Sequence, residues 1–351
     1  MSSTGDKQHE VLGSGAGLAS SVAFESGTEL GEIEQVRARG YWEQVWIRFR
    51  KDKVAIGSAI FIVFLVLVCF FGAILAEKLV GHGPDDLFFD GLDERLTPKG
   101  PFSHVTNPQT GEQQAFILGA DGSLGRDEFL RLLYGGRVSL EVAVISTFSA
   151  MFLGTLLGAT AGYFRGWIDT VISRITEVTM AFPALLFIIA LASTVGSRID
   201  SVTLGIFSPG VVTLVLVFSL FGWFYPCRII RSQVLSLREK EFVEAARMIG
   251  ASDWRIIRSH LLPHLVAPII VYSTLIVAGY VLGEAGLSFL GLGIKLPTAS
   301  WGNLLATAPE YYTAQPWLMV WPGLAVLLTT LAFNLLGDGL RDAFDPRSSH
   351  R

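Results

Sequence analysis

The sequence predicts an all-α integral membrane protein with six transmembrane helices and one helical segment on the cytoplasmic side. Hydrophobic residues make up 51% of its 351 residues and charged residues only 17%, which is too apolar for a soluble protein of this length. Six long runs contain no charged residue, and a polar segment with helical character, residues 241–263, separates the fourth run from the fifth. The chain is therefore expected to cross a bilayer repeatedly and to present one structured segment outside it.

The N-terminal part comes before any apolar run. Residues 1–40 are rich in Gly, Ser and acidic residues, which predicts a disordered cytoplasmic tail. Residues 41–53 alternate basic and aromatic side chains, namely Trp42, Trp46, Arg48, Phe49, Arg50, Lys51 and Lys53. This basic segment fits an amphipathic helix lying on membrane lipid, and equally well a positive flank that only orients the next span. Because a long polar tail precedes the first run, we expect that span to be uncleaved.

About 20 helical residues cross roughly 30 Å of hydrocarbon, and each uncharged run reaches about that length. The runs are residues 54–76, 142–164, 178–197, 201–227, 265–283 and 315–337. An even number of spans places both termini on one side. Of the 27 Lys and Arg, only Lys78, Arg95, Lys99, Arg126, Arg131, Arg137, Arg198 and Lys295 fall on the side opposite the termini. The positive-inside rule therefore predicts that both termini are cytoplasmic.

The same topology assigns the two largest loops. The loop of about residues 77–140 is extracytoplasmic, and it reads as a stretch punctuated by Pro and Gly, too small and polar to fold as a domain, followed by a short amphipathic helix at 127–134. The loop of about residues 228–263 is cytoplasmic and contains the 241–263 segment. Within that segment we predict a helix over 242–249, a left-handed Gly250, and a second helix from Asp253 that Pro263 stops.

A helix, a glycine hinge and a helix fit either a DNA-binding helix-turn-helix or a helical knob that docks a partner protein. The flanking membrane spans favour the knob, because a loop tethered to the bilayer at both ends cannot readily enter a major groove. The formal net charge of −4 also gives no basic field, so nucleic acid is not expected as a partner.

The 241–263 segment resembles the cytoplasmic signature of bacterial ABC importer permeases. That signature has Glu-Ala-Ala, three residues, Gly, nine residues and then Ile-x-Leu-Pro. The matching residues here are Glu244, Ala245, Ala246, Gly250, Leu262 and Pro263. His260 departs from the signature, which has Ile at that position.

Other stretches are similar to the dipeptide, oligopeptide and nickel importer permeases. These importers have two different permeases each, and the similarity is to the one with the longer first extracytoplasmic loop. They are residues 118–127, 134–140, 161–163, 287–293, 297–303 and 337–346. The first stretch departs from the family pattern by Ala120 in place of Thr and by one extra residue before Gly125. The resemblance covers roughly residues 41–347.

This resemblance implies a type I ABC importer permease, with a six-helix domain over 54–347 and a short tail at 348–351, in a bacterial or archaeal plasma membrane. It implies a second homologous permease, two cytoplasmic ATPase subunits gripped through the helix containing Glu244 and Gly250, and an extracytoplasmic substrate-binding protein. The chain has no phosphate-binding Gly-x4-Gly-Lys-Ser/Thr motif, so ATP and Mg are expected on the partners. No cofactor and no enzymatic activity are expected of this chain.

A stand-alone secondary transporter or channel is the alternative. That class is expected to show internal repeats and ionisable residues near the membrane midplane, and neither is evident in the sequence. Peptides are the favoured cargo, although the resemblance equally covers importers of nickel chelates and other solutes.

Overall fold

The computed structural model describes residues 40–107, 111–202, 208 and 210–345, with the side chains of 195–202 left out of that description. The chain divides into a unit of residues 1–44 and a unit Val45–Arg351. All the long apolar helices belong to the second unit. The tails predicted at 1–40 and 348–351 lie, apart from Gly40, outside the described residues.

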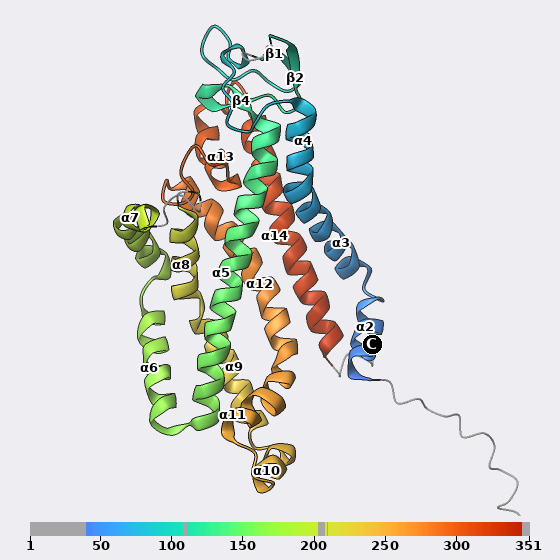
Figure 1. Cartoon of the computed structure of the whole chain (residues 1–351), viewed down its shortest axis with the longest axis vertical. Coiled ribbons are helices and arrows are strands. Elements are labelled where there is room, and N and C mark those ends of the chain that lie inside the picture. The colour runs from blue at the N-terminus through green and yellow to red at the C-terminus, as the bar shows by residue number, and fades with distance from the viewer. Residues whose placement is uncertain (1–39, 108–110, 203–207, 209, 346–351) are drawn as a thin grey trace, which may run out of the picture. The chain divides into compact units, whose positions relative to one another are not determined.

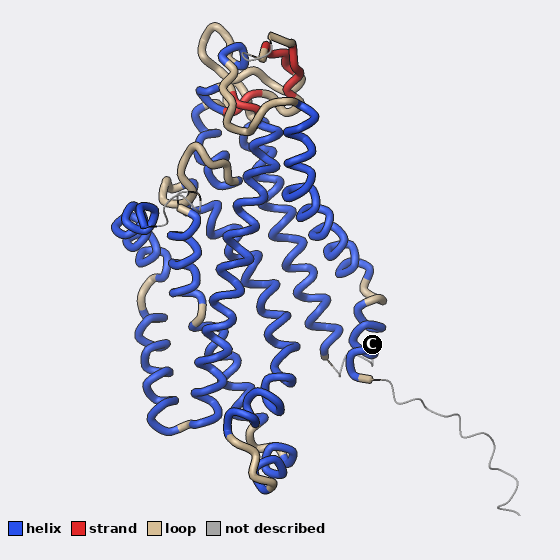
Figure 2. The backbone as a smooth tube through the Cα atoms, viewed as in Figure 1, coloured by secondary structure: helices blue, strands red, loops and turns tan. Residues whose placement is uncertain are grey.

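Helices account for most of the described chain (Figures 1 and 2). In this part of the chain, two wider π-helical turns interrupt the long helical segments. The helices are α2 (Tyr41–Phe49), α3 (Lys53–Leu67), α4 (Ala73–Val80), α5 (Glu128–Phe164), α6 (Gly166–Ala181), α7 (Ala184–Val202), α8 (Val211–Gly222), α9 (Phe224–Leu237), α10 (Glu241–Met248), α11 (Asp253–Arg255), α12 (Leu262–Phe289), α13 (Trp301–Thr307) and α14 (Trp317–Phe344). The π-helical turns are η1 (Val68–Gly72) and η4 (Ile256–Leu261).

Within the described residues, five continuous helical segments are long and apolar enough to cross a membrane, and the bent pair α6 and α7 makes a sixth if counted as one span. The continuous segments are Lys53–Val80, Glu128–Phe164, Val211–Leu237, Asp253–Phe289 and Trp317–Phe344. Each overlaps one of the predicted runs. The predicted all-α membrane fold is confirmed.

Helix α5 organises the second unit. It packs against α8, α9 and α12, while α14 packs against both α12 and α3 (Figure 1). Side chains from α5, α12, α13 and α14 meet in one buried cluster that includes Leu140, Val281, Trp301 and Phe333. The long helices are thus joined by an apolar core inside the bundle as well as by their small residues.

Three glycines at four-residue spacing, Gly154, Gly158 and Gly162, bring α5 into close contact with α9. A Cβ atom built on Gly158 would lie 2.5 Å from the carbonyl oxygen of Cys227, and one on Gly162 would lie 2.9 Å from that of Arg231. Backbones approach this closely only where side chains are absent. The stripe therefore fixes the distance between the two helices.

Replacing Gly158 by Ala should lower the free energy of unfolding by about 1–3 kcal/mol, the usual cost of overpacking a tight contact. Alanine is the better helix former by about 1 kcal/mol, so a loss of stability can come only from the contact with α9. Gly279→Ala in α12 is the matched control, because no atom lies within 4 Å of its added Cβ. Thermal unfolding of the purified protein in detergent measures both, and equal midpoints for the two variants would refute this account of the stripe.

The third predicted run, residues 178–197, does not form one straight helix. The chain instead forms α6 and α7, which meet at an angle of 86°. Pro183 explains the break, because a residue before proline is pushed out of the helical region, and Phe182 has φ −85° and ψ 141°. Residues 203–207 and 209, in the connection to α8, lie outside the described residues.

Pro263 does not stop a helix, contrary to the sequence prediction. It lies in the first turn of α12, directly after the π-helical turn η4, and the helical segment runs from Asp253 to Phe289. A proline removes one backbone donor, and a turn with i to i+5 hydrogen bonding accommodates that loss. Pro268 and Pro322 likewise lie inside continuous helices.

Residues 81–127, which we call the cap, cover one end of the bundle (Figure 1). Two antiparallel pairs form there, β1 (Ser103–Thr106) with β2 (Gln113–Phe116), and β3 (Ala120–Asp121) with β4 (Arg126–Asp127). Phe88, Val105, Phe116 and Ala120 form its buried cluster. The helix predicted at 127–134 is not a separate short helix, since residues 128–134 are the first turns of α5. The cap belongs to the unit Val45–Arg351, and the expectation that it is too small and polar to be a domain of its own stays a prediction.

Candidate functional site

The 241–263 segment lies at the end of the bundle opposite the cap (Figure 1). Helix α10 ends with Gly250 in the left-handed conformation, at φ 81°, as predicted. The amide of Gly250 donates to the carbonyl of Arg247 (2.9 Å), and that of Ala251 donates to the carbonyl of Ala246 (3.0 Å). This pair of bonds is a Schellman C-cap. Glycine is required there by the backbone conformation alone, because no atom lies within 4 Å of an added Cβ.

One face of α10 packs against the chain's own bundle. Val243 and Ala246 are buried in a cluster with Tyr163, Ile230 and Leu265. Ala251 and Leu262 pack on the same cluster. The side chain of Ala246 is 3% exposed and packs on the chain's own core, whereas that of Ala245 is exposed.

The other face of this segment is exposed and apolar. Met248 and Ile249 are 83% and 85% exposed, more than any other large apolar side chain among the described residues. Trp254 is 59% exposed beside them along the chain. Met248 and Ile249 lie outside the candidate spans, so burial against a partner protein would remove them from water. We call Met248, Ile249 and Trp254 the exposed apolar face.

Polar contacts hold the 241–263 segment to α5 and α9. The Tyr163 hydroxyl donates to Asp253 Oδ1 (2.6 Å), and the guanidinium carbons of Arg238 and Arg247 lie 5.6 and 5.3 Å from the Tyr163 ring centroid. Beside them, a hydrogen bond from Arg165 holds the pKa of the Glu239 carboxyl below its usual range. The exposed apolar face is thus presented by a backbone that is tied to the bundle.

The structure brings the predicted site residues into one region but gives them different environments. Glu244, Ala245, Gly250 and Pro263 are exposed, whereas Leu262 is half-buried. His260 is also half-buried, and the fully buried positions of its π-helical turn belong to Ile256, Ile257 and Leu261. The sequence reasoning missed the exposed apolar face, although a Met-Ile pair at the end of a polar helix is a signal that could have revealed it.

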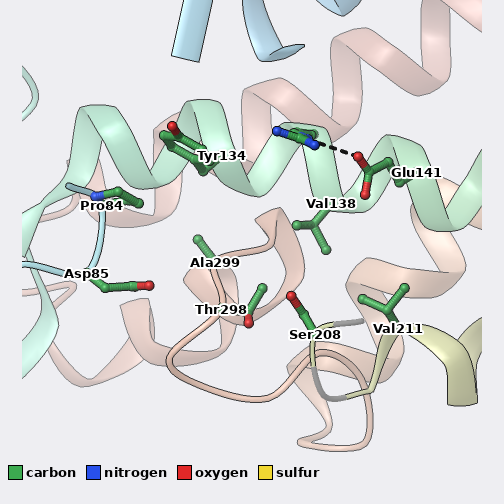
Figure 3. A pocket seen from close by; sticks show the side chains of 10 residues that line it. Pro84, Asp85, Tyr134, Val138, Glu141, Ser208, Val211, Thr298 and Ala299 are labelled. Carbon is green, nitrogen blue, oxygen red and sulfur yellow. Dashed lines mark hydrogen bonds and ion pairs between the residues drawn. The ribbon is translucent and has the colours of Figure 1, made fainter. Parts of the chain in front are cut away.

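A second feature is a cavity of about 430 Å³ near the cap (Figure 3). One wall is α5, and the others come from distant segments of the chain. Its lining residues are Pro84, Asp85, Tyr134, Arg137, Val138, Glu141, Ser208, Val211, Thr298 and Ala299. Arg137 and Val138 belong to the stretch 134–140 that resembles the importer permeases, and both lie in the wall of this cavity.

A buried charged cluster fastens the cap to α5. Arg131 is fully buried, with Nη1 2.7 Å from Asp85 Oδ1 and Nε 2.6 Å from Asp121 Oδ2. Its Nη1 also donates to the carbonyl of Pro297 (3.1 Å). Arg126 joins the same Asp121 at 3.0 Å, and burial together with the nearby Arg131 lowers the pKa of the Arg126 guanidinium. The cap, α5 and the segment after α12 are thus linked by one guanidinium.

Glu284 is fully buried inside the bundle. Its carboxylate accepts hydrogen bonds from the Ser139 and Ser288 hydroxyls, both at 2.7 Å. The backbone amide of Trp301 donates to the Ser139 hydroxyl (3.2 Å), and that of Ile294 donates to the Ser288 hydroxyl (3.2 Å). The carboxylate therefore joins α5, α12 and the segment before α13 in one hydrogen-bonded network. Among the described residues, no group of three or more His, Cys, Asp or Glu is arranged to hold a metal ion.

Two family models match this chain. One describes the inner membrane component of binding-protein-dependent transport systems and matches residues 154–350, more than half of the chain. The chain belongs to this family. The other, the N-terminal transmembrane domain of oligopeptide transport permease C, matches residues 40–98.

Several relatives match this chain over about nine tenths of its length. A glutathione transport system permease protein of Pectobacterium atrosepticum is 36% identical over 316 residues, covering 90% of this chain and 94% of that protein. A protein of the same description from Escherichia coli is 38% identical over 90% of this chain and 93% of its own length. A dipeptide transport system permease protein of Alkalihalophilus pseudofirmus is 34% identical, over 90% of this chain and 92% of its own length.

A solved structure shows the same fold. A chain of the MetNI methionine ABC transporter, in an inward-facing conformation, aligns with a TM-score of 0.50 at 16% identity and covers 62% of this chain and 97% of that one. Family and fold together identify a multi-pass permease subunit of an ABC importer in the inner membrane. The family is a transport component rather than a catalytic one, and the stand-alone transporter or channel is not favoured.

Proposed function

We propose that the 241–263 segment is the surface through which this permease receives ATP-driven motion from a separate ATPase subunit. The exposed apolar face supports the proposal, because Met248 and Ile249 lose contact with water only when a partner covers them. Ala245 and Glu244 lie on the exposed part of the same helix, and Gly250 sets the turn that presents it. Ala246 and Leu262 contribute by holding the segment to the bundle, and Pro263 lies in the first turn of α12 that follows it.

The proposal includes the orientation of the chain. The 241–263 segment and both termini face the cytoplasm, where the Lys and Arg excess lies, and the cap faces the opposite side. A cytoplasmic ATPase then reaches α10, and an extracytoplasmic binding protein reaches the cap. Two ATPase subunits carry ATP and Mg, and each engages one of two homologous permeases that share the translocation path.

Short peptides are the proposed cargo. The relatives named for glutathione and dipeptide transport cover about nine tenths of this chain. The substrate passes from the binding protein to the path between the two permeases, and alternating access follows the ATPase cycle.

Uptake into proteoliposomes tests the proposal. Vesicles containing this chain, its partner permease and the ATPases, with the binding protein outside and ATP inside, should accumulate labelled glutathione or alanyl-alanine. Removal of ATP or of this chain should each reduce uptake to background. Equal uptake by this chain alone, driven by an ion gradient without ATPase, would overturn the proposal.

A further inference from the structure

The cavity near the cap brings opposite charges together in a small volume. Its roughly 430 Å³ lies within the range of about 300–1,000 Å³ that small-molecule sites occupy. Figure 3 places Glu141 and Val138 on α5, with Asp85, Thr298 and Ser208 on segments across from that helix. We propose that this cavity is a recognition site for a short zwitterionic peptide on its way into the path. The inference rests on the proposed function, since it names the substrate class that the permease receives.

Arg137 is the group that would bind the peptide carboxylate. Its Nε donates to Glu141 Oε1 at 2.9 Å, and its guanidinium carbon lies 5.4 Å from the ring centroid of Phe70. Within the described part of the chain, its two terminal nitrogens donate to no protein group. A guanidinium held by one nitrogen and by an aromatic face keeps a fork of donors that fits a carboxylate.

The pair between Arg137 and Glu141 is easily exchanged for a ligand. The two side chains are 40% and 34% exposed and lie four residues apart on one helix. Pairs of this kind contribute little to stability because water solvates both partners. A peptide that offers both a carboxylate and an ammonium replaces the two halves of the pair at once.

Carboxylates lie on two sides of the cavity. Glu141 is in α5, and Asp85 reaches in from the cap with its side chain 48% exposed, while Arg131 holds its Oδ1 at 2.7 Å. Either carboxylate is suited to a peptide ammonium. The hydroxyls of Ser208 and Thr298 offer hydrogen bonds to a peptide bond, and Val138 offers contact to a small side chain.

The mixed charge also selects against other solutes. A simple anion is attracted by Arg137 but repelled by the carboxylates of Glu141 and Asp85. A simple cation is attracted by these carboxylates but repelled by Arg137. Only a ligand with both charges pairs favourably with the whole set, which is how specificity arises from unfavourable contacts with competitors. A zwitterion is therefore the class of ligand that the lining favours.

Isothermal titration of the detergent-purified full chain tests the inference. We expect alanyl-alanine to bind at least about 10-fold more tightly than N-acetyl-alanyl-alanine or alanyl-alanine amide, each of which lacks one charge. Arg137→Gln should weaken alanyl-alanine binding about 10-fold and bring it to the level of the amide, whereas Arg137→Lys should recover part of the loss. Arg174→Gln is the matched control, because Arg174 is also ion-paired within one helix, to Glu177 at 2.8 Å, but lies outside the cavity.

Thermal unfolding should confirm that every variant is folded. No binding of alanyl-alanine, equal binding of the three ligands, or unchanged binding by Arg137→Gln would each overturn the inference. The measurement needs no ATPase, so peptide binding without ATP-driven uptake would count against the proposed function alone. Uptake in vesicles without any such binding would count against this site alone.

Discussion

Replacing Met248 and Ile249 together by aspartate should reduce ATP-driven uptake by at least about 10-fold while the protein remains folded in the membrane. Two exposed apolar side chains at the centre of a docking surface are expected to cost more than about 1 kcal/mol each when lost, and 1.4 kcal/mol corresponds to a factor of 10. Because both side chains are more than 80% exposed, the free energy of unfolding should change by no more than about 0.5 kcal/mol.

The control for this variant keeps the apolar character of the exposed face. Met248→Leu with Ile249→Leu should retain most of the uptake, because volume and hydrophobicity are nearly preserved. Uptake in proteoliposomes and ATPase activity of the assembled complex are the two measurements. Wild-type uptake by the aspartate variant would show that the exposed apolar face does not dock the ATPase.

The second large effect is expected at Arg131. Replacing it by methionine should lower the free energy of unfolding by about 3–5 kcal/mol, because a buried carboxylate would lose its cation. Asp121 would keep only Arg126, and the carbonyl of Pro297 would lose a donor. The contact of the cap with α5 should be the first part of the molecule to open.

Thermal unfolding and limited proteolysis together measure this effect. Arg131→Met should lower the midpoint and expose residues 81–127 to cleavage. Arg174→Met is the control, because Arg174 is 76% exposed and its pair with Glu177 contributes at most a few tenths of a kcal/mol. If the two methionine variants unfold alike, the buried cluster does not hold the cap.

The sequence predicted the membrane helices because an uncharged run is a local property that a bilayer demands of every span. It also predicted the left-handed Gly250, since a helix C-cap is decided within a few residues. Local reasoning failed at Pro263, where a proline was read as a stop although a π-helical turn accommodates it. At 178–197 the uncharged run overlaps α6 and α7, and Pro183 divides it between these two helices.

The site was harder to predict, because which face of a helix is already occupied depends on the rest of the fold. Ala245 and Ala246 are neighbours in sequence, yet only the tertiary packing buries Ala246 and leaves Ala245 exposed. The cavity near the cap could not be predicted from the sequence for the same reason. Its walls come from segments more than 200 residues apart, such as those containing Asp85 and Thr298.

The central claim is that the exposed apolar face touches the ATPase, and a single cysteine tests it most directly. The chain's own cysteines, Cys69 and Cys227, are 2% and 1% exposed, so they should react little. Met248→Cys should crosslink to the ATPase subunit of the assembled transporter through a short thiol-to-amine reagent. Phe89→Cys, equally exposed on the cap, should not crosslink to that subunit. Crosslinking from Phe89→Cys and none from Met248→Cys would contradict both the docking surface and the orientation proposed for the chain.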